Sequence, residues 1–316
     1  MSFSLDVKED LLKVKNNNII SDKLELEAML RFASEVSLMR PMKLSFTCNN
    51  MGIVRKLVKL CKKYYKIEYD IISRTINRFD NHTLFTCEIY EGAEEIIKDL
   101  NLLMDNSSYA INELDEENAS SYLRGAFIVK GSVNDPNSKS SHLEISTTVE
   151  SQVIFIQKLM NMFDLNARIA KRKNYLIVYL KAKQAIGDFL YRLGALASME
   201  YYEDIIITKE IKATAKRTVN LDVANQDKTN KASKDYIRYI NYLTINYPLD
   251  ELDSKLLMVM KVRKDYPEYS LSQLLDIIHD EYDPYLTKSG LNHRLRRIKE
   301  LALELQEKKK KENDDA

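Results

Sequence analysis

The stretch 287-TKSGLNHRLRRIKELA-302 has the periodicity of a helix with one apolar and one basic face. Winding it at about 100° per residue brings Leu291, Leu295 and Ile298 onto one line, which Ala302 and Leu305 extend. Residues 288–311 hold nine basic side chains and three acidic ones. We expect the polar face and its flanks to contact DNA, through Lys288, Ser289, Asn292, His293, Arg294, Arg296, Arg297 and Lys299.

Two further helices precede this one. Residues 250–265 have an apolar side, and 270-SLSQ-273 has the form of a capping box, with Ser270 and Gln273 three residues apart. Two helices and then a basic helix are typical of a helix-turn-helix, whose last helix enters the major groove. There Asn can bind adenine and Arg can bind guanine, while other cations hold phosphates. An ordinary solvated basic helix remains the alternative, and the acidic connection 279-HDEYDPYL-286 is longer than the usual tight turn.

The first two hundred residues contain one order of elements twice. Strand patterns begin at residues 43 and 142, helices at 52 and 149, and strand pairs at 67 and 167. The helix over 119–130 is expected to end in a turn at Gly131, and 73–81 reads as a polar turn between strands 67–72 and 82–90. An internal duplication explains this order. It predicts an α+β fold of two α/β repeats with mostly antiparallel strands, followed by an all-α domain.

These patterns predict five segments. The first repeat covers residues 1–106, the second 107–207, a basic helical linker 208–248, the helix-turn-helix domain 249–306 and a charged, disordered tail 307–316. The linker is basic because residues 209–238 contain eight basic and four acidic side chains, without Gly or Pro.

Three motifs resemble the WhiA family of bacterial regulators. They are 121-SYLRGAFIVKGSVNDP-136, 217-RTVNLDVANQDKTNKA-232 and 287-TKSGLNHRLRRIKELA-302, and the resemblance extends over roughly residues 20–305. It implies a degenerate LAGLIDADG homing-endonuclease scaffold of two pseudo-symmetric units, joined to a C-terminal helix-turn-helix. It also implies a role in transcription control, cell division and chromosome segregation.

The resemblance also locates two positions that are acidic in nucleases of this scaffold. In the second repeat Lys130 precedes Gly131, and in the first repeat Ala33 precedes Ser34. Neither Ala33 nor Lys130 can give a carboxylate to a hard cation, and a lysine repels Mg²⁺. The sequence therefore predicts no catalytic residues, no metal site, no cofactor and no enzymatic activity.

Other regions can add DNA contacts. Residues 51–66 contain six basic side chains and no acid, and a second basic cluster surrounds residues 168–173. The secondary candidates for phosphate contact are Arg55, Lys59, Lys63, Lys171, Arg172 and Arg217. Solvated surface charge is the alternative for all of them.

Composition restricts the other classes of function. With 48 Lys+Arg against 47 Asp+Glu the net charge is +1, so a uniformly basic protein is excluded. No apolar run approaches the roughly 20 residues of a membrane span, and the N-terminus lacks the pattern of a signal peptide. Cys48, Cys61 and Cys87 form no CxxC pair, which favours buried thiols over a zinc site.

The expected protein is thus a sequence-specific DNA-binding transcription regulator in the cytoplasm, associated with the nucleoid. Its partners are double-stranded DNA and other transcription proteins, with no membrane and no metal. Two rival functions stay open, an active LAGLIDADG-type endonuclease and a protein-interaction scaffold with vestigial DNA binding.

Overall fold

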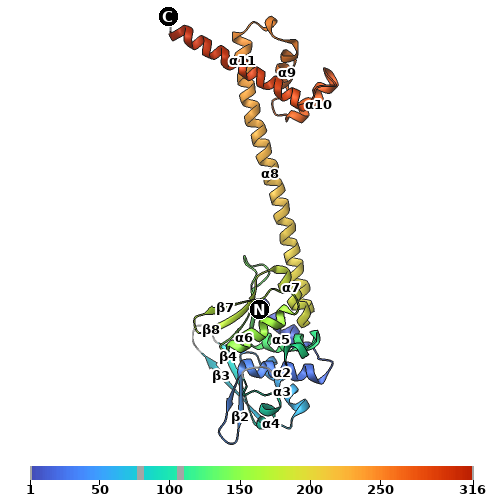
Figure 1. The fold of residues 1–316 in the computed structure, drawn as a ribbon, viewed down its shortest axis with the longest axis vertical. Helices are drawn as coiled ribbons and strands as arrows, with labels where there is room; N and C mark the ends of the chain where they lie inside the picture. Colours follow the sequence, from blue (N-terminus) through green and yellow to red (C-terminus); the bar gives the residue numbers. More distant parts are fainter. Residues whose placement is uncertain (1, 77–81, 105–109, 315–316) are drawn as a thin grey trace. The chain divides into compact units, whose positions relative to one another are not determined.

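The computed structural model describes residues 2–76, 82–104 and 110–314 (Figure 1). Contacts between residues divide the chain into two compact units, Met1–Glu210 and Ile211–Ala316. No helix in the described part of the chain is long and apolar enough to cross a membrane.

The first unit contains two repeats built in the same order. Each repeat has a four-stranded antiparallel sheet, with strand order β1-β2-β4-β3 in the first and β5-β6-β8-β7 in the second. The equivalent strand order of the two sheets confirms the predicted duplication and fold class. The elements of the first repeat are α2 (Ile19–Ala33), β1 (Ser34–Ser37), β2 (Lys43–Cys48), α3 (Met51–Tyr64), β3 (Glu68–Ile76), β4 (His82–Glu91) and α4 (Ala93–Asp99). Those of the second are α5 (Glu116–Lys130), β5 (Gly131–Val133), β6 (Leu143–Thr147), α6 (Glu150–Asn161), β7 (Arg168–Arg172), β8 (Tyr175–Leu180) and α7 (Lys183–Leu193).

Helices α2 and α5 pack against each other at the centre of this unit (Figure 1). Each has 15 residues and begins after a capping side chain, since Asn18 accepts a hydrogen bond from the Ser21 amide and Asp115 from the Asn118 amide. Each helix runs directly into the first strand of its sheet. Ala33 is therefore the last residue of α2, and Lys130 is the last residue of α5.

Several local features differ from the predictions. A helix that the sequence did not predict, α1 (Phe3–Lys13), precedes α2, and a short 3₁₀ helix, η1 (Ile111–Glu113), precedes α5. Gly131 starts strand β5 where a turn was predicted, because its backbone pairs with β6. Strand β3 extends to Ile76 into the predicted turn 73–81, of which residues 77–81 lie outside the described ranges.

The second unit consists of helices. Helix α8 (Leu196–Asn246) begins in the first unit and continues into the second, and it includes most of the predicted helical linker 208–248. Its last turns join the core of the second unit through Ile240 and Leu243, so this core begins before residue 249, where the sequence placed the domain boundary. The following elements are η2 (Leu249–Glu251), α9 (Ser254–Asp265), α10 (Leu271–Glu281) and α11 (Lys288–Asp314). The tail predicted to be disordered from residue 307 continues α11 as far as Asp314.

The cysteines agree with the prediction. Cys48, Cys61 and Cys87 are all buried and free, inside the core of the first unit. Burial raises the pKa of Cys61 to about 12 and that of Cys87 to about 11, so both stay uncharged thiols near neutral pH.

Candidate nucleic-acid interface

Helix α11 is held in the second unit by its apolar face. Leu291, Leu295, Ile298 and Ala302 are fully buried, as the helical periodicity predicted. At its start, the Thr287 hydroxyl accepts a hydrogen bond from the Gly290 amide at 3.1 Å. The opposite face is therefore fixed toward solvent.

Four polar residues form a stripe on that exposed face, at the first two turns of α11. Ser289, His293 and Arg296 are exposed, and Asn292 is partly exposed. Their spacing of three, four and seven residues from Ser289 places them on one side of a helix. Within the described ranges, the side chains of these four residues form no hydrogen bond or ion pair with the protein. Their donors and acceptors are available to a partner, and we call them the recognition stripe.

Arg294, which was predicted to contact DNA, lies outside this stripe. Its side chain is only 16% exposed, and its Nη2 lies 3.5 Å from Asp283 Oδ2 in the connection before α11. This pairing ties the start of α11 to the preceding connection. The guanidinium of Arg294 is thus already paired with a carboxylate of its own domain.

The other predicted cations are exposed but differ in their partners. Lys288 Nζ donates to Ser272 Oγ of α10 at 2.8 Å. Arg297 lies 3.4 Å from Glu300 and 3.5 Å from Glu304. Lys299 is exposed, and no interaction of its ammonium occurs within the described residues.

The two helices before α11 are held by specific polar contacts. Ser270 and Gln273 make the predicted capping box, in which each side chain bonds the backbone amide of the other residue. His279 Nε2 lies 2.6 Å from the carbonyl oxygen of Leu286, which closes the connection between α10 and α11. Arg263 is buried and donates to the carbonyl oxygen of Tyr269 at 2.8 Å. These contacts hold in place the two helices against which the helix of the recognition stripe packs.

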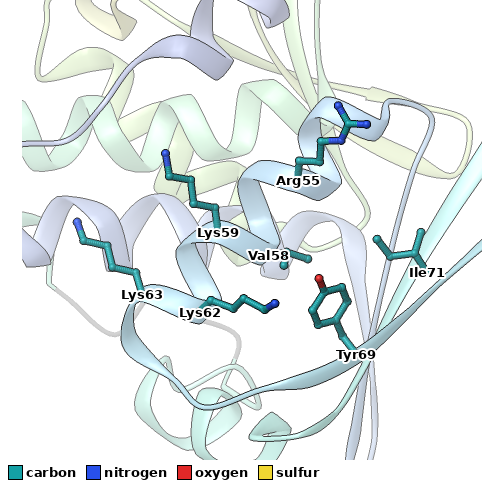
Figure 2. Close-up of a pocket in the computed structure, with 7 residues that line it drawn as sticks. All are labelled: Arg55, Val58, Lys59, Lys62, Lys63, Tyr69 and Ile71. Carbon is teal, nitrogen blue, oxygen red and sulfur yellow. The ribbon is translucent and has the colours of Figure 1, made fainter.

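A second basic surface lies on α3 in the first unit (Figure 2). Arg55, Lys59, Lys62 and Lys63 border a hollow of about 510 Å³ between α3 and β3. Lys62 points toward Tyr69, with its Nζ 4.8 Å from the ring centre, whereas Lys59 and Lys63 extend away from that ring (Figure 2). Tyr69 and Lys62 were not among the predicted site residues, and only the fold brings the strand to this helix.

The three predicted cations of α3 are not equivalent. Arg55 and Lys59 are exposed, and neither forms an ion pair within the described ranges. Lys63 lies 2.5 Å from the Asp22 carboxylate. Hydrogen bonds from its ammonium to Asp22 and Tyr64 raise the pKa of Lys63 above its usual range. Its charge is therefore already shared with a carboxylate.

The remaining secondary candidates are not brought together by the structure. Lys171 and Arg172 are neighbours on β7 and point to opposite faces of the sheet. Arg172 Nη1 lies 3.2 Å from Glu144 of β6. Arg217 belongs to the second unit, where it is exposed and donates to the Thr214 hydroxyl on α8.

The positions that are acidic in LAGLIDADG nucleases border a shared cavity. Ala33 and Lys130, the C-terminal residues of α2 and α5, both line a space of about 520 Å³. Lys8 of α1 lines the same space. A divalent cation needs several oxygen ligands, whereas this lining carries two ammonium groups and one carboxylate, that of Glu35. These residues do not fit a metal ion of the nuclease type.

Comparison with known proteins gives one consistent result. Three family models match in order, the WhiA N-terminal LAGLIDADG-like domain at residues 20–103, the WhiA LAGLIDADG-like domain at 119–212 and the WhiA C-terminal HTH domain at 215–302. The chain is 34% identical to the probable cell division protein WhiA of Enterococcus faecalis, covering 98% of this chain and 99% of that one. It is 36% identical to the protein of the same name from Ligilactobacillus salivarius, covering 96% of each. The crystal structure of full-length DUF199/WhiA from Thermatoga maritima matches its fold with a TM-score of 0.61 at 24% identity, covering 96% of this chain and 99% of that one.

Proposed function

The chain belongs to the WhiA family, as its motifs predicted, and from this premise we propose that it is a sequence-specific, non-enzymatic DNA-binding regulator of transcription. The recognition stripe carries this proposal, since it places Ser289, Asn292, His293 and Arg296 in solvent on the last helix of a helix-turn-helix domain. The names of the relatives support a role in cell division, and we extend the proposal to chromosome segregation and to a place at the nucleoid.

The chemistry of the stripe suits base recognition. The first turns of such a helix reach base edges in the major groove. Asn292 offers the donor and acceptor pair that matches adenine, and Arg296 offers the two-pronged donor that matches guanine. Lys288, Arg297 and Lys299 lie nearby, where cations would hold phosphates and orient the helix.

The first unit has a supporting role in this proposal. Arg55 and Lys59 on α3 would contribute phosphate contacts without base preference. Its other surfaces would receive further transcription proteins.

Selection of bound duplexes from a random pool tests the proposal. The parent protein should enrich one sequence, and Asn292→Ala and Arg296→Ala should each relax the preference at particular base pairs by about 1–3 kcal/mol. Arg238→Ala is the matched control, because Arg238 is an exposed arginine of the same unit, on α8. Unchanged preference in both stripe variants would refute this site, and absence of DNA binding at every ionic strength would favour the scaffold function.

The proposal also excludes phosphodiester cleavage. Alanine and lysine end the two central helices where nucleases of this scaffold require carboxylates. Supercoiled plasmid incubated with Mg²⁺ or Mn²⁺ should therefore stay intact. Metal-dependent nicking by the purified protein that persists in Lys130→Ala would show a nuclease site elsewhere.

A further inference from the structure

We propose that the cavity at the ends of α2 and α5 is an anion site that binds a phosphate group between Lys8 and Lys130. The cavity has a volume of about 520 Å³, within the range of small-molecule sites. It collects residues from α1, α2, β1, β2, β4 and α5. The lining residues that matter for binding are Lys8, Glu35, Ser45, Asn49 and Lys130.

The charge in this cavity favours an anion. Lys8 is partly buried, and the ammonium groups of Lys8 and Lys130 form no ion pair within the described ranges. The pKa of Lys8 is lowered to about 8, mainly by burial; Cys48 opposes this shift, and the positive charge of Lys130 contributes to it. An anion held between the two ammonium groups would stabilise the charged form of Lys8.

The uncharged groups of the lining also suit phosphate oxygens. Ser45 and Asn49 line the cavity, and neither side chain has a hydrogen-bond partner among the described residues. Each can donate to an oxygen of the anion. Ser34 and Thr47 already bond Leu30 and Thr86, so they complete the polar wall.

One carboxylate faces the same space. Glu35 lies on β1, is exposed, and has no ion pair within residues 2–76, 82–104 and 110–314. It would repel a phosphate and therefore limits the affinity. Glu35→Gln removes this negative charge and should therefore bind phosphate more tightly.

Two sources can supply the phosphate, a small phosphorylated molecule or a phosphodiester of DNA lying against the first unit. The chemistry of recognition is the same for both. The small-molecule arm of the test is independent of the proposed function, because it needs no DNA.

Competitive acetylation read by mass spectrometry tests the site in the full chain. Only neutral amines react, so the labelling rate of each lysine across pH reports its pKa. At pH 8 about half of the Lys8 amines are neutral, and raising the pKa by about one unit would slow labelling about fivefold. Pyrophosphate is the probe in one arm and an unselected duplex in the other, while Lys13, an exposed lysine on the same helix, is the internal reference.

The arms have distinct outcomes. Slower labelling of Lys8 with pyrophosphate would show a small-molecule site, and protection by the duplex alone would show a phosphodiester site. Lys130→Met should abolish the protection, and it should raise the pKa of Lys8 in the absence of any anion. Glu35→Gln should increase the protection. Equal effects on Lys8 and Lys13, or no protection of Lys8 by either probe, would overturn the proposal.

Discussion

Gly125 of α5 lies so close to Glu25 of α2 that a side chain has no room between them. A Cβ atom built on Gly125 would stand 2.3 Å from the carbonyl oxygen of Glu25 and 2.9 Å from the Cβ of Ala28. The first obstacle is backbone and cannot rotate away. This contact fixes the crossing of the two central helices, and with it the cavity at their ends.

Gly125→Ala should therefore destabilise the first unit. Alanine improves helix propensity by about 1 kcal/mol, but the overlap with backbone should outweigh that gain and leave a net loss of about 1–3 kcal/mol. Calorimetric unfolding of the full chain would show the change as a lower melting temperature for this unit.

Gly187→Ala in α7 is the matched control. Its new Cβ would meet the Glu203 carboxylate at 3.2 Å, and that exposed side chain can move. This variant should be as stable as the parent or more stable. If Gly125→Ala unfolded no earlier than Gly187→Ala, the close approach of α2 and α5 would be wrong.

Asp22 on α2 should make stability depend on pH in acid. Burial alone would raise its pKa, but hydrogen bonds from Lys63, Tyr64 and Asn16 prevail and hold the pKa below the usual range. The stabilisation is thus complete above about pH 4 and is lost as the pH falls through the lowered pKa of the folded state.

The Asp22→Asn variant isolates this effect. Unfolding free energies of parent and variant, measured from pH 6 to pH 2, should differ most at pH 6 and converge in acid. Asp10 and Asp99, whose pKa values are also lowered, remain in both proteins and cancel in the difference. A difference that stays constant across this range would contradict the assignment.

Arg294 and Arg296 should separate stability from recognition. Removing Arg294 breaks its contact with Asp283, so Arg294→Met should cost about 1 kcal/mol of stability in the second unit and leave base preference unchanged. Arg296→Ala should relax base preference and leave the stability of the second unit unchanged. Thermal unfolding and duplex selection on both variants measure the two effects, and relaxed preference in Arg294→Met would return that residue to the contact set.

Sequence alone predicted the parts of this fold that depend on local periodicity. Helical periodicity predicted the buried line through Leu291 and Leu295, whereas the equivalence of Ala33 and Lys130, which end α2 and α5, came from the family resemblance. Helix α1 was missed although Phe3, Val7 and Leu11, four residues apart, are all buried. That spacing is typical of one face of a helix and could have predicted α1.

Other features depend on tertiary contacts that no local pattern contains. On a helical wheel Arg294 only flanks the polar face, and its contact with Asp283 appears once the connection folds back. Lys8 joins Lys130 because α1 packs against α5. The continuity of α8 was partly foreseeable, since residues 196–246 contain no Gly or Pro to end a helix.

Lys59 and Lys63, one helical turn apart on α3, should respond differently to substitution. Lys59→Ala should weaken binding to all duplexes by one factor and reduce the slope of affinity against salt by about 1, because a free ammonium is lost from the phosphate surface. Lys63→Ala should change that slope less, since its ammonium is shared with Asp22, and should reduce stability above about pH 4. Mobility shifts over a salt series and acid unfolding measure both. An effect of Lys59→Ala confined to one sequence, or equal slopes in the two variants, would show that α3 does not contact DNA through its unpaired cations.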